Sequence, residues 1–106
     1  MMQELDRQIV TEFRHRLEAI IPILDLRVFG SRARGDATEE SDLDIFIKIP
    51  EIDLPLRQQI RDLAWEVGFE SDRVISTFVV TEAQVQTGAV GASPLLSKVL
   101  AEGVTI

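Results

Sequence analysis

Apolar side chains recur every three or four positions in three stretches of the chain, a spacing that is typical of amphipathic helices. The predicted helices cover residues 3–21, residues 53–67 and residues 94–102. Gly68 suits the C-terminal cap of the second helix, because glycine readily adopts the left-handed backbone that ends many helices. The apolar face of the first helix, which is expected to pack into the core, consists of Leu5, Ile9, Phe13, Leu17 and Ile20.

Other stretches are rich in β-branched residues and end at glycine, proline or polar positions, which indicates strands. The predicted strands cover residues 24–29, 43–49, 73–80 and 104–106, the last of them a short edge strand. Polar residues 31–41 are expected to form a turn with one helical turn in it, and a loop is expected at residues 88–92. The spacing of Thr81 and Gln84 matches a capping box that opens a short helix. This alternation predicts one α/β (α+β) domain over residues 1–106, a small sheet with helices packed against it.

The amino-acid composition limits the chemistry that the protein can perform. The chain has no cysteine and one histidine, His15, which excludes disulfides, thiolate chemistry and zinc sites built from these residues. The net charge of −7 argues against an extended nucleic-acid surface, although local arginines could still hold one phosphate-bearing ligand. No apolar run is long enough to span a membrane and the first residues lack a signal-peptide core, so we expect a cytoplasmic protein without membrane contact.

The end of the first predicted strand carries residues that suit a phosphate group. The strand runs into Gly30 and Ser31, and a residue without a side chain lets a ligand approach the backbone closely. Amide groups of the following turn and the Ser31 hydroxyl can donate hydrogen bonds to phosphate oxygens. Arg32 and Arg34 come next and can neutralise a polyphosphate. Taken singly, a Gly-Ser turn is common and both arginines would be ordinary surface charges.

Two carboxylates stand at the start of the second predicted strand. Because side chains alternate along a strand, Asp42 and Asp44 share one face while Leu43 points into the core. Carboxylates this close repel each other unless a cation lies between them. Oxygen ligands of this kind suit Mg²⁺, and two metal ions held this way can assist phosphoryl or nucleotidyl transfer. A lone Asp-x-Asp is more often a solvated strand end, so its combination with Gly30 and Ser31 carries the interpretation.

These residues resemble a known signature. The chain is similar to the DNA polymerase β-like nucleotidyltransferase superfamily, and residues 28–49 look like its minimal nucleotidyltransferase (MNT) branch. The resemblance implies a mixed sheet flanked by helices, like the polymerase β palm, and ATP or another NTP bound through Mg²⁺. It implies that phosphates are held at Gly30 and Ser31, and metal ions at Asp42 and Asp44. Many similar proteins are antitoxins paired with an all-helical HEPN-type toxin, to which some transfer AMP.

The chain departs from the superfamily pattern at one position. Active members generally have a third carboxylate on the next strand. The residue that aligns with it here is Ser76, which supplies no negative charge for a metal ion. Asp72 at the entry to that strand and Glu70 just before it are alternative carboxylates, although Asp72 is better explained as an ordinary turn residue.

Three explanations of function compete. The first is a nucleotidyltransferase that moves a nucleoside monophosphate from NTP to an acceptor hydroxyl, as the MNT antitoxin of a HEPN-type partner. The second is a catalytically degenerate module that binds nucleotide and neutralises a partner protein by contact, which Ser76 favours. The third is a small α/β domain whose motif is accidental. A homo-oligomer is compatible with all three.

Overall fold

The computed structural model describes residues 1–88 and 93–106, so the loop predicted at 88–92 lies outside the described residues except for Gly88. The longer helices are α1 (Glu4–Glu18), α3 (Leu54–Ser71) and α5 (Pro94–Glu102). Two helices of one turn or so are α2 (Gly30–Arg34) and α4 (Glu82–Gln86). The strands are β1 (Asp25–Phe29), β2 (Leu43–Ile49), β3 (Ile75–Thr81) and β4 (Val104–Thr105).

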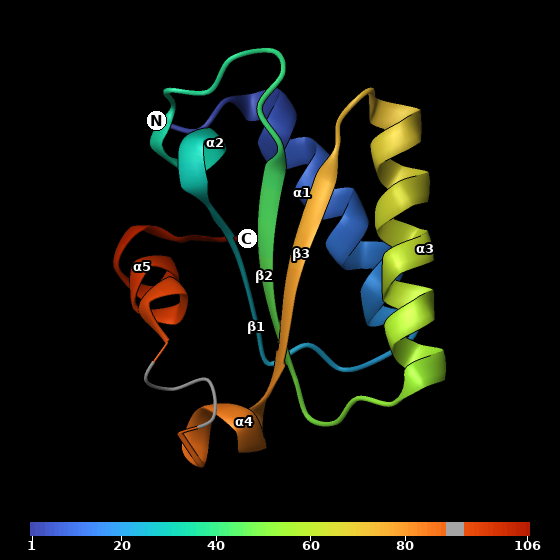
Figure 1. Cartoon of the computed structure of the whole chain (residues 1–106). Coiled ribbons are helices and arrows are strands. Elements are labelled where there is room, and N and C mark those ends of the chain that lie inside the picture. Colours follow the sequence, from blue (N-terminus) through green and yellow to red (C-terminus); the bar gives the residue numbers. More distant parts are fainter. Residues whose placement is uncertain (89–92) are drawn as a thin grey trace.

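The strands form one mixed sheet in the order β3-β2-β1-β4. β1 pairs antiparallel with β2 and with β4, whereas β2 and β3 run parallel. Figure 1 shows α1 and α3 on one side of this sheet and α5 on the other. The predicted class, a small mixed sheet with helices packed against it, is confirmed, and helices cover both faces of the sheet.

The two faces of the sheet bury very different amounts of apolar surface. The larger core lies between the sheet and helices α1 and α3, and alternate residues of β2 point into it. Its fully buried members include Val10, Phe13, Leu17, Leu26, Val28, Leu43, Ile45, Ile47, Ile49, Ile60 and Val67. The smaller cluster lies under α5 and consists of Phe29, Phe46, Val80, Leu96 and Val99.

The buried face of α1 differs from the predicted one. Leu5 and Ile20 are exposed, whereas Asp6 and Val10 are buried. Ile20 lies beyond the end of the helix, whose C-cap is Ala19. Asp6 is buried because two arginines from distant parts of the chain converge on its carboxylate. The spacing of apolar residues cannot predict that a charged residue such as Asp6 is buried, because its burial depends on ion pairs with distant residues.

Helix α3 begins where the sequence predicts and ends later. Its N-cap is Asp53, whose carboxylate accepts a hydrogen bond of 2.8 Å from the backbone NH of Leu56. The predicted cap at Gly68 is wrong, because the helix continues to Asp72, which has a left-handed φ of 55° and is the C-cap. Gly68 instead makes room inside the helix, since a Cβ atom there would lie 2.5 Å from the carbonyl oxygen of Arg73.

The capping box predicted from Thr81 and Gln84 is confirmed. Thr81 and Gln84 form the capping box of α4, and the Ser93 hydroxyl accepts a hydrogen bond from the backbone NH of Leu95 at the start of α5. In the part of the chain that the structure describes, no helix is both long enough and apolar enough to cross a membrane.

Candidate active site

The turn from β1 into α2 places its backbone directly beside Asp44. Gly30 has a positive φ of 75°, a conformation that glycine adopts without strain. A Cβ atom at this position would lie 2.5 Å from Oδ2 of Asp44, so a larger residue would collide with the carboxylate. Ser31 follows in the first turn of α2 and is half-buried. The structure therefore places Gly30, with Ser31 next to it in the chain, beside Asp44 of the neighbouring strand.

The two carboxylates lie at the start of β2, where Asp42 directly precedes the strand and Asp44 is its second residue. Asp44 is half-buried and Asp42 is exposed. Burial raises the pKa of the Asp44 carboxyl above its ordinary value, the negative charge of Asp42 raises this pKa further, and the positive charge of Lys98 lowers it. Among the described residues, neither carboxylate forms an ion pair. The two carboxylates therefore repel each other, and a cation bound between them would remove this repulsion.

A divalent cation with a preference for oxygen fits this pair. Asp42 and Asp44 offer hard carboxylate oxygens and no nitrogen or sulfur donor. Within residues 1–88 and 93–106, no group of three or more acidic, histidine or cysteine side chains could hold a metal ion unaided. Mg²⁺ is commonly bound by one or two protein carboxylates, with water and substrate phosphate oxygens completing its ligands. The donor set therefore suits Mg²⁺ brought together with a nucleotide.

Ser76 is the residue of β3 that pairs with Asp44. The parallel register places Ser76 of β3 directly beside Asp44 of β2. Of the two alternative carboxylates, Glu70 is 2.9 Å from Arg16 of α1, and Asp72 is the C-cap of α3. The strand position nearest to Asp44 therefore carries a neutral hydroxyl group.

Arg32 is engaged in the interior and does not extend toward a ligand. It is 4% exposed. Its guanidinium donates to the carbonyl oxygen of Ser41 at 3.0 and 3.2 Å, to that of Glu39 at 3.4 Å, and to Oδ2 of Asp6 at 3.4 Å. Asp6 also accepts from Nε of Arg73 at 3.2 Å. This geometry disfavours the predicted phosphate contact of Arg32 and explains the residue as an anchor for the loop that leads to Asp42.

Arg34 of α2 and Lys98 of α5 are exposed cations on the two helices that pack against β1. Arg34 is exposed and pairs with Asp36 at 3.2 Å and with Glu102 of α5 at 3.3 Å. Helix α5 packs against β1 and α2, and this packing brings the charge of Lys98 within reach of Asp44. No signal in the sequence points to Lys98, because its proximity to Asp44 depends on which face of the sheet α5 covers.

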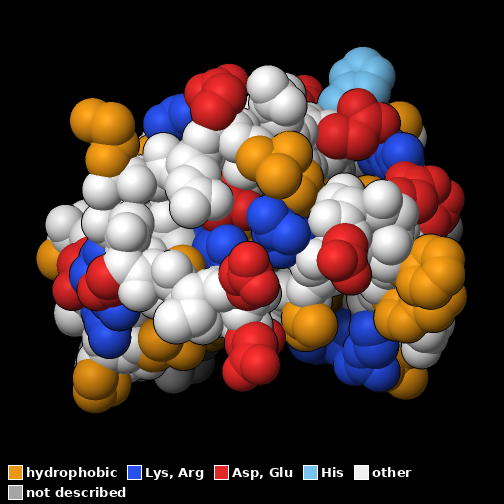
Figure 2. Space-filling view, turned by 90° about the horizontal axis from the view of Figure 1, so that it is seen from above, with side chains coloured by type: hydrophobic (Ala, Val, Ile, Leu, Met, Phe, Trp, Pro, Cys, Tyr) orange, Lys and Arg blue, Asp and Glu red, His pale blue; other side chains and the backbone are white. Residues whose placement is uncertain are grey.

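The surface at this end of the molecule carries both signs of charge. Figure 2, which looks down on the end that holds α2 and the loop before β2, shows acidic and basic side chains interspersed over the surface. Such a pattern suits recognition of a small, locally charged ligand better than a long polyanion.

A mixed sheet in which a glycine turn after one strand closely approaches a carboxylate on the next suits a domain that binds phosphate groups. A family model described as "Nucleotidyltransferase domain" matches residues 7–86. The chain belongs to this family, and the resemblance to minimal, DNA polymerase β-like nucleotidyltransferases is confirmed.

Individual relatives agree with this assignment. The chain is 32% identical over 80 residues, 74% of its own length and 75% of the other's, to "Putative protein adenylyltransferase MJ0141" of Methanocaldococcus jannaschii. A solved structure of a "putative minimal nucleotidyltransferase" matches with a TM-score of 0.60 and 26% identity, covering 95% of both chains. A Shewanella oneidensis complex, described as a tri-AMPylated HEPN toxin with MNT antitoxin, matches with a TM-score of 0.58 and 20% identity. That match covers 98% of this chain and 71% of the other, and supports the fold.

Proposed function

We propose that this protein transfers AMP from ATP to a hydroxyl group of a HEPN-type partner protein, with Mg²⁺ held at Asp42 and Asp44. The observation that carries the proposal is the close approach of the Gly30 turn to Asp44, because it joins a backbone suited to phosphate with carboxylates suited to a metal ion. The adenylyltransferase name of the archaeal relative and the AMPylated toxin of the Shewanella complex favour AMP as the transferred group.

The transfer needs few groups from the protein. An acceptor oxygen attacks the α-phosphorus of ATP, its proton passes to solvent, and the bond from that phosphorus to the bridging oxygen breaks, so that pyrophosphate leaves with the bonding electrons. Gly30 lets the phosphates approach the backbone, and the Ser31 hydroxyl can donate to a phosphate oxygen. Mg²⁺ bound at Asp42 and Asp44 would neutralise charge on the phosphates. Arg34 remains a candidate for the outer phosphate oxygens.

Ser76 favours a second function, in which the protein binds nucleotide and neutralises its partner by contact. Two-metal transfer uses carboxylates to hold both cations, and the site offers two of them. With a neutral residue beside Asp44, one cation would have few anionic ligands. Nucleotide binding depends on the Gly30 turn and would persist, whereas turnover would be slow or absent.

Calorimetric titration with ATP tests the shared part of both functions. We expect binding that requires Mg²⁺ and that weakens at least about tenfold when Asp42 and Asp44 are both replaced by asparagine, because charged ligands are lost. The matched control replaces Glu39 and Glu40 by glutamine, which removes the same charge from the neighbouring loop. Equal affinity in the two double variants would show that the metal site is assigned wrongly.

Transfer itself separates the two functions. ATP labelled in its α-phosphate is incubated with the protein and a HEPN-type partner, and label on the partner and released pyrophosphate are both measured. Covalent label that disappears in the Asp42→Asn/Asp44→Asn variant supports AMP transfer. Tight nucleotide and partner binding without label would instead support neutralisation by contact.

A further inference from the structure

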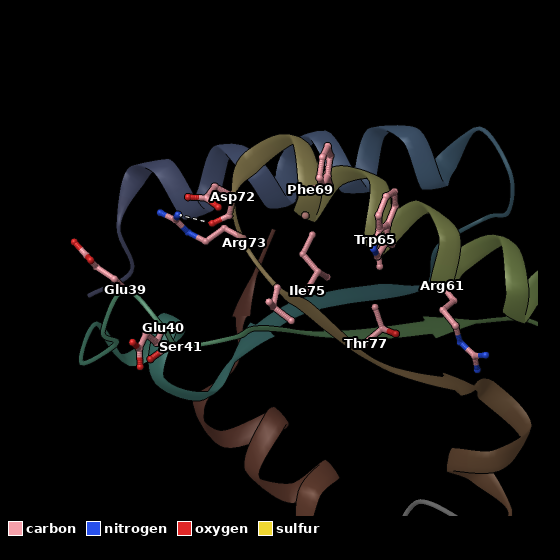
Figure 3. Close-up of a pocket in the computed structure, with 13 residues that line it drawn as sticks. Glu39, Glu40, Ser41, Arg61, Trp65, Phe69, Asp72, Arg73, Ile75 and Thr77 are labelled. Carbon is pink, nitrogen blue, oxygen red and sulfur yellow. Dashed lines mark hydrogen bonds between the residues drawn. The ribbon is translucent and has the colours of Figure 1, made fainter.

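A groove with one wall of exposed aromatic side chains lies on the sheet face opposite to Asp44. It has a volume of about 800 Å³ and runs between α3 and β3 (Figure 3). Trp65 and Phe69 of α3 form one wall and are 69% and 75% exposed. Their rings stack with centroids 5.2 Å apart and an interplanar angle of 12°. Large aromatic side chains this exposed are uncommon on the surface of a monomer and often mark an interaction site.

The strand beside these aromatics has a free edge. β3 lies at the end of the sheet, and in the described part of the chain it pairs with β2 alone. Its sequence, ISTFVVT, contains no charge and no proline. Proteins usually protect a free edge with charged residues, proline or a bulge, because unpaired backbone groups invite another strand. The edge of β3 has neither charge nor proline and is therefore competent to pair.

The charges of the groove are divided between its two ends. Figure 3 shows Glu39, Glu40 and Asp72 at the end where β3 begins, and Arg61 at the opposite end, with the aromatic rings between them. None of these four side chains has an ion-pair partner among the described residues. Arg73 also lies at the acidic end, but its charge is matched by Asp6 at 3.2 Å.

We propose that this face binds a second copy of the chain, with residues 73–77 at the start of the two β3 edges paired antiparallel around a twofold axis near Ile75. Antiparallel pairing reverses the second groove, so the acidic end of each copy meets Arg61 of the other, and the complementary contact occurs twice. The pairing also brings the Trp65 and Phe69 rings of both copies onto the same side of a continuous sheet. A parallel arrangement would set like charges side by side.

The dimer goes beyond the proposed nucleotide chemistry and does not depend on it. Ile75 and Thr77 face the groove, whereas Ser76 between them points to the face that carries Asp44. Strand pairing through the β3 edge therefore leaves the candidate active site of each copy open. A failure of nucleotide binding would not affect the dimer, and a monomeric protein could still bind nucleotide.

Sedimentation equilibrium of the full chain at roughly 1 to 100 µM tests the proposal. Salt of about 0.15 M screens the long-range repulsion between two chains that each carry a net charge of −7. We expect a reversible dimer, and dilution should change the fluorescence of Trp65, the one tryptophan in the chain. Trp65→Glu should weaken dimerisation at least about tenfold, because an aromatic anchor is replaced by a charge. The matched control is Leu100→Glu, which alters an exposed apolar residue of α5.

A charge reversal distinguishes this dimer from any other. Arg61→Glu should weaken the dimer, since it faces three carboxylates of the second copy. Adding Glu39→Arg and Glu40→Arg to Arg61→Glu should restore the dimer, because the two ends then carry opposite charges again. Restoration cannot arise from a loss of folding. A wild-type monomer at the highest concentration, an equal effect of Trp65→Glu and Leu100→Glu, or a failure of the combined variant to recover would overturn the proposal.

Discussion

Two aspartates of this molecule are removed from solvent to different extents and differ in whether a positive charge pairs with them. Asp6 is 1% exposed and its carboxylate is matched by Arg32 and Arg73. Asp44 is half-buried, and the nearby charge of Asp42 raises its pKa in addition to the effect of burial. Asp6 is fully paired within the chain, whereas Asp44 has no ion-pair partner among the described residues and its charge is only partly offset by that of Lys98. The comparison separates a carboxylate that serves the structure from one that is available to a cation.

The two aspartates are nevertheless connected. Arg32, held by Asp6, donates two hydrogen bonds to the carbonyl oxygen of Ser41, the residue immediately before Asp42. The paired charge thus fixes the backbone from which the unpaired charges project. Loss of the Asp6 carboxylate should lower the free energy of unfolding. It should also disturb the positions of Asp42 and Asp44, because Arg32 would no longer be held against Ser41.

The largest effect is expected from Asp6→Asn. The substitution leaves a buried arginine without its counter-charge, and breaking a buried pair in this way costs about 3 to 5 kcal/mol. Urea unfolding followed by circular dichroism measures the free energy of unfolding. Asp36→Asn, which alters an exposed carboxylate paired with Arg34, is the control and should leave that free energy unchanged. A loss below about 1 kcal/mol for Asp6→Asn would show that the buried charges are not energetically coupled.

A smaller effect is expected from Ser76→Asp, which adds a carboxylate beside Asp44. Mn²⁺, followed by electron paramagnetic resonance as a probe for Mg²⁺, should bind about tenfold more tightly because the site gains an anionic ligand. AMP transfer, where it occurs, should become faster. Ser76→Asn is the control, because asparagine has the shape of aspartate without its charge. It should change neither the Mn²⁺ affinity nor the rate of AMP transfer. If Ser76→Asp leaves metal affinity unchanged and Asp72→Asn reduces it, the third ligand comes from the end of α3.

The smallest effect is expected from Asp44→Asn on stability in the absence of metal. Because the pKa of Asp44 is raised in the folded state, its ionised form costs stability at neutral pH, and that cost disappears as pH falls through the raised pKa. The asparagine variant should be more stable than the wild type at pH 7, by less than about 1 kcal/mol, since the group is partly solvated. Thermal unfolding between pH 7 and pH 4 should show the two proteins converging toward acid. A gap that widens toward acid would reverse the sign of our interpretation.

The sequence predicted elements well where one local rule dominates. Residues 43–49 form β2 with the predicted bounds, because apolar residues at every second position from Leu43 define its core face and Pro50 defines its end. The Gly30 turn follows from equally local reasoning, and the structure adds the close approach of Gly30 to Asp44. Their roles as nucleotide and metal ligands stay predictions that the experiments above address.

Predictions were poorer where distant segments decide the outcome. Arg32 was expected at a phosphate, yet its position is determined by Asp6, 26 residues earlier in the chain. Gly68 has the chemistry of a helix cap, but its role follows from how closely the chain passes at Arg73. Lys98 reaches Asp44 through the packing of α5 alone. Each case depends on a tertiary contact that neither periodicity nor spacing encodes.

Because the apolar cores on the two faces of the sheet differ in size, the segments that cover them should unfold locally in a definite order. Helix α5 rests on a small cluster around Phe46, and β4 adds a two-residue ladder to β1, whereas α1 and α3 share the extended core around Phe13. Segments with few buried apolar neighbours exchange their amide hydrogens through local opening, well below the free energy of global unfolding. The α5–β4 unit should therefore exchange ahead of α3. Each opening would move Lys98 away from Asp44, so the affinity of the two carboxylates for a cation would depend on whether the α5–β4 unit is closed.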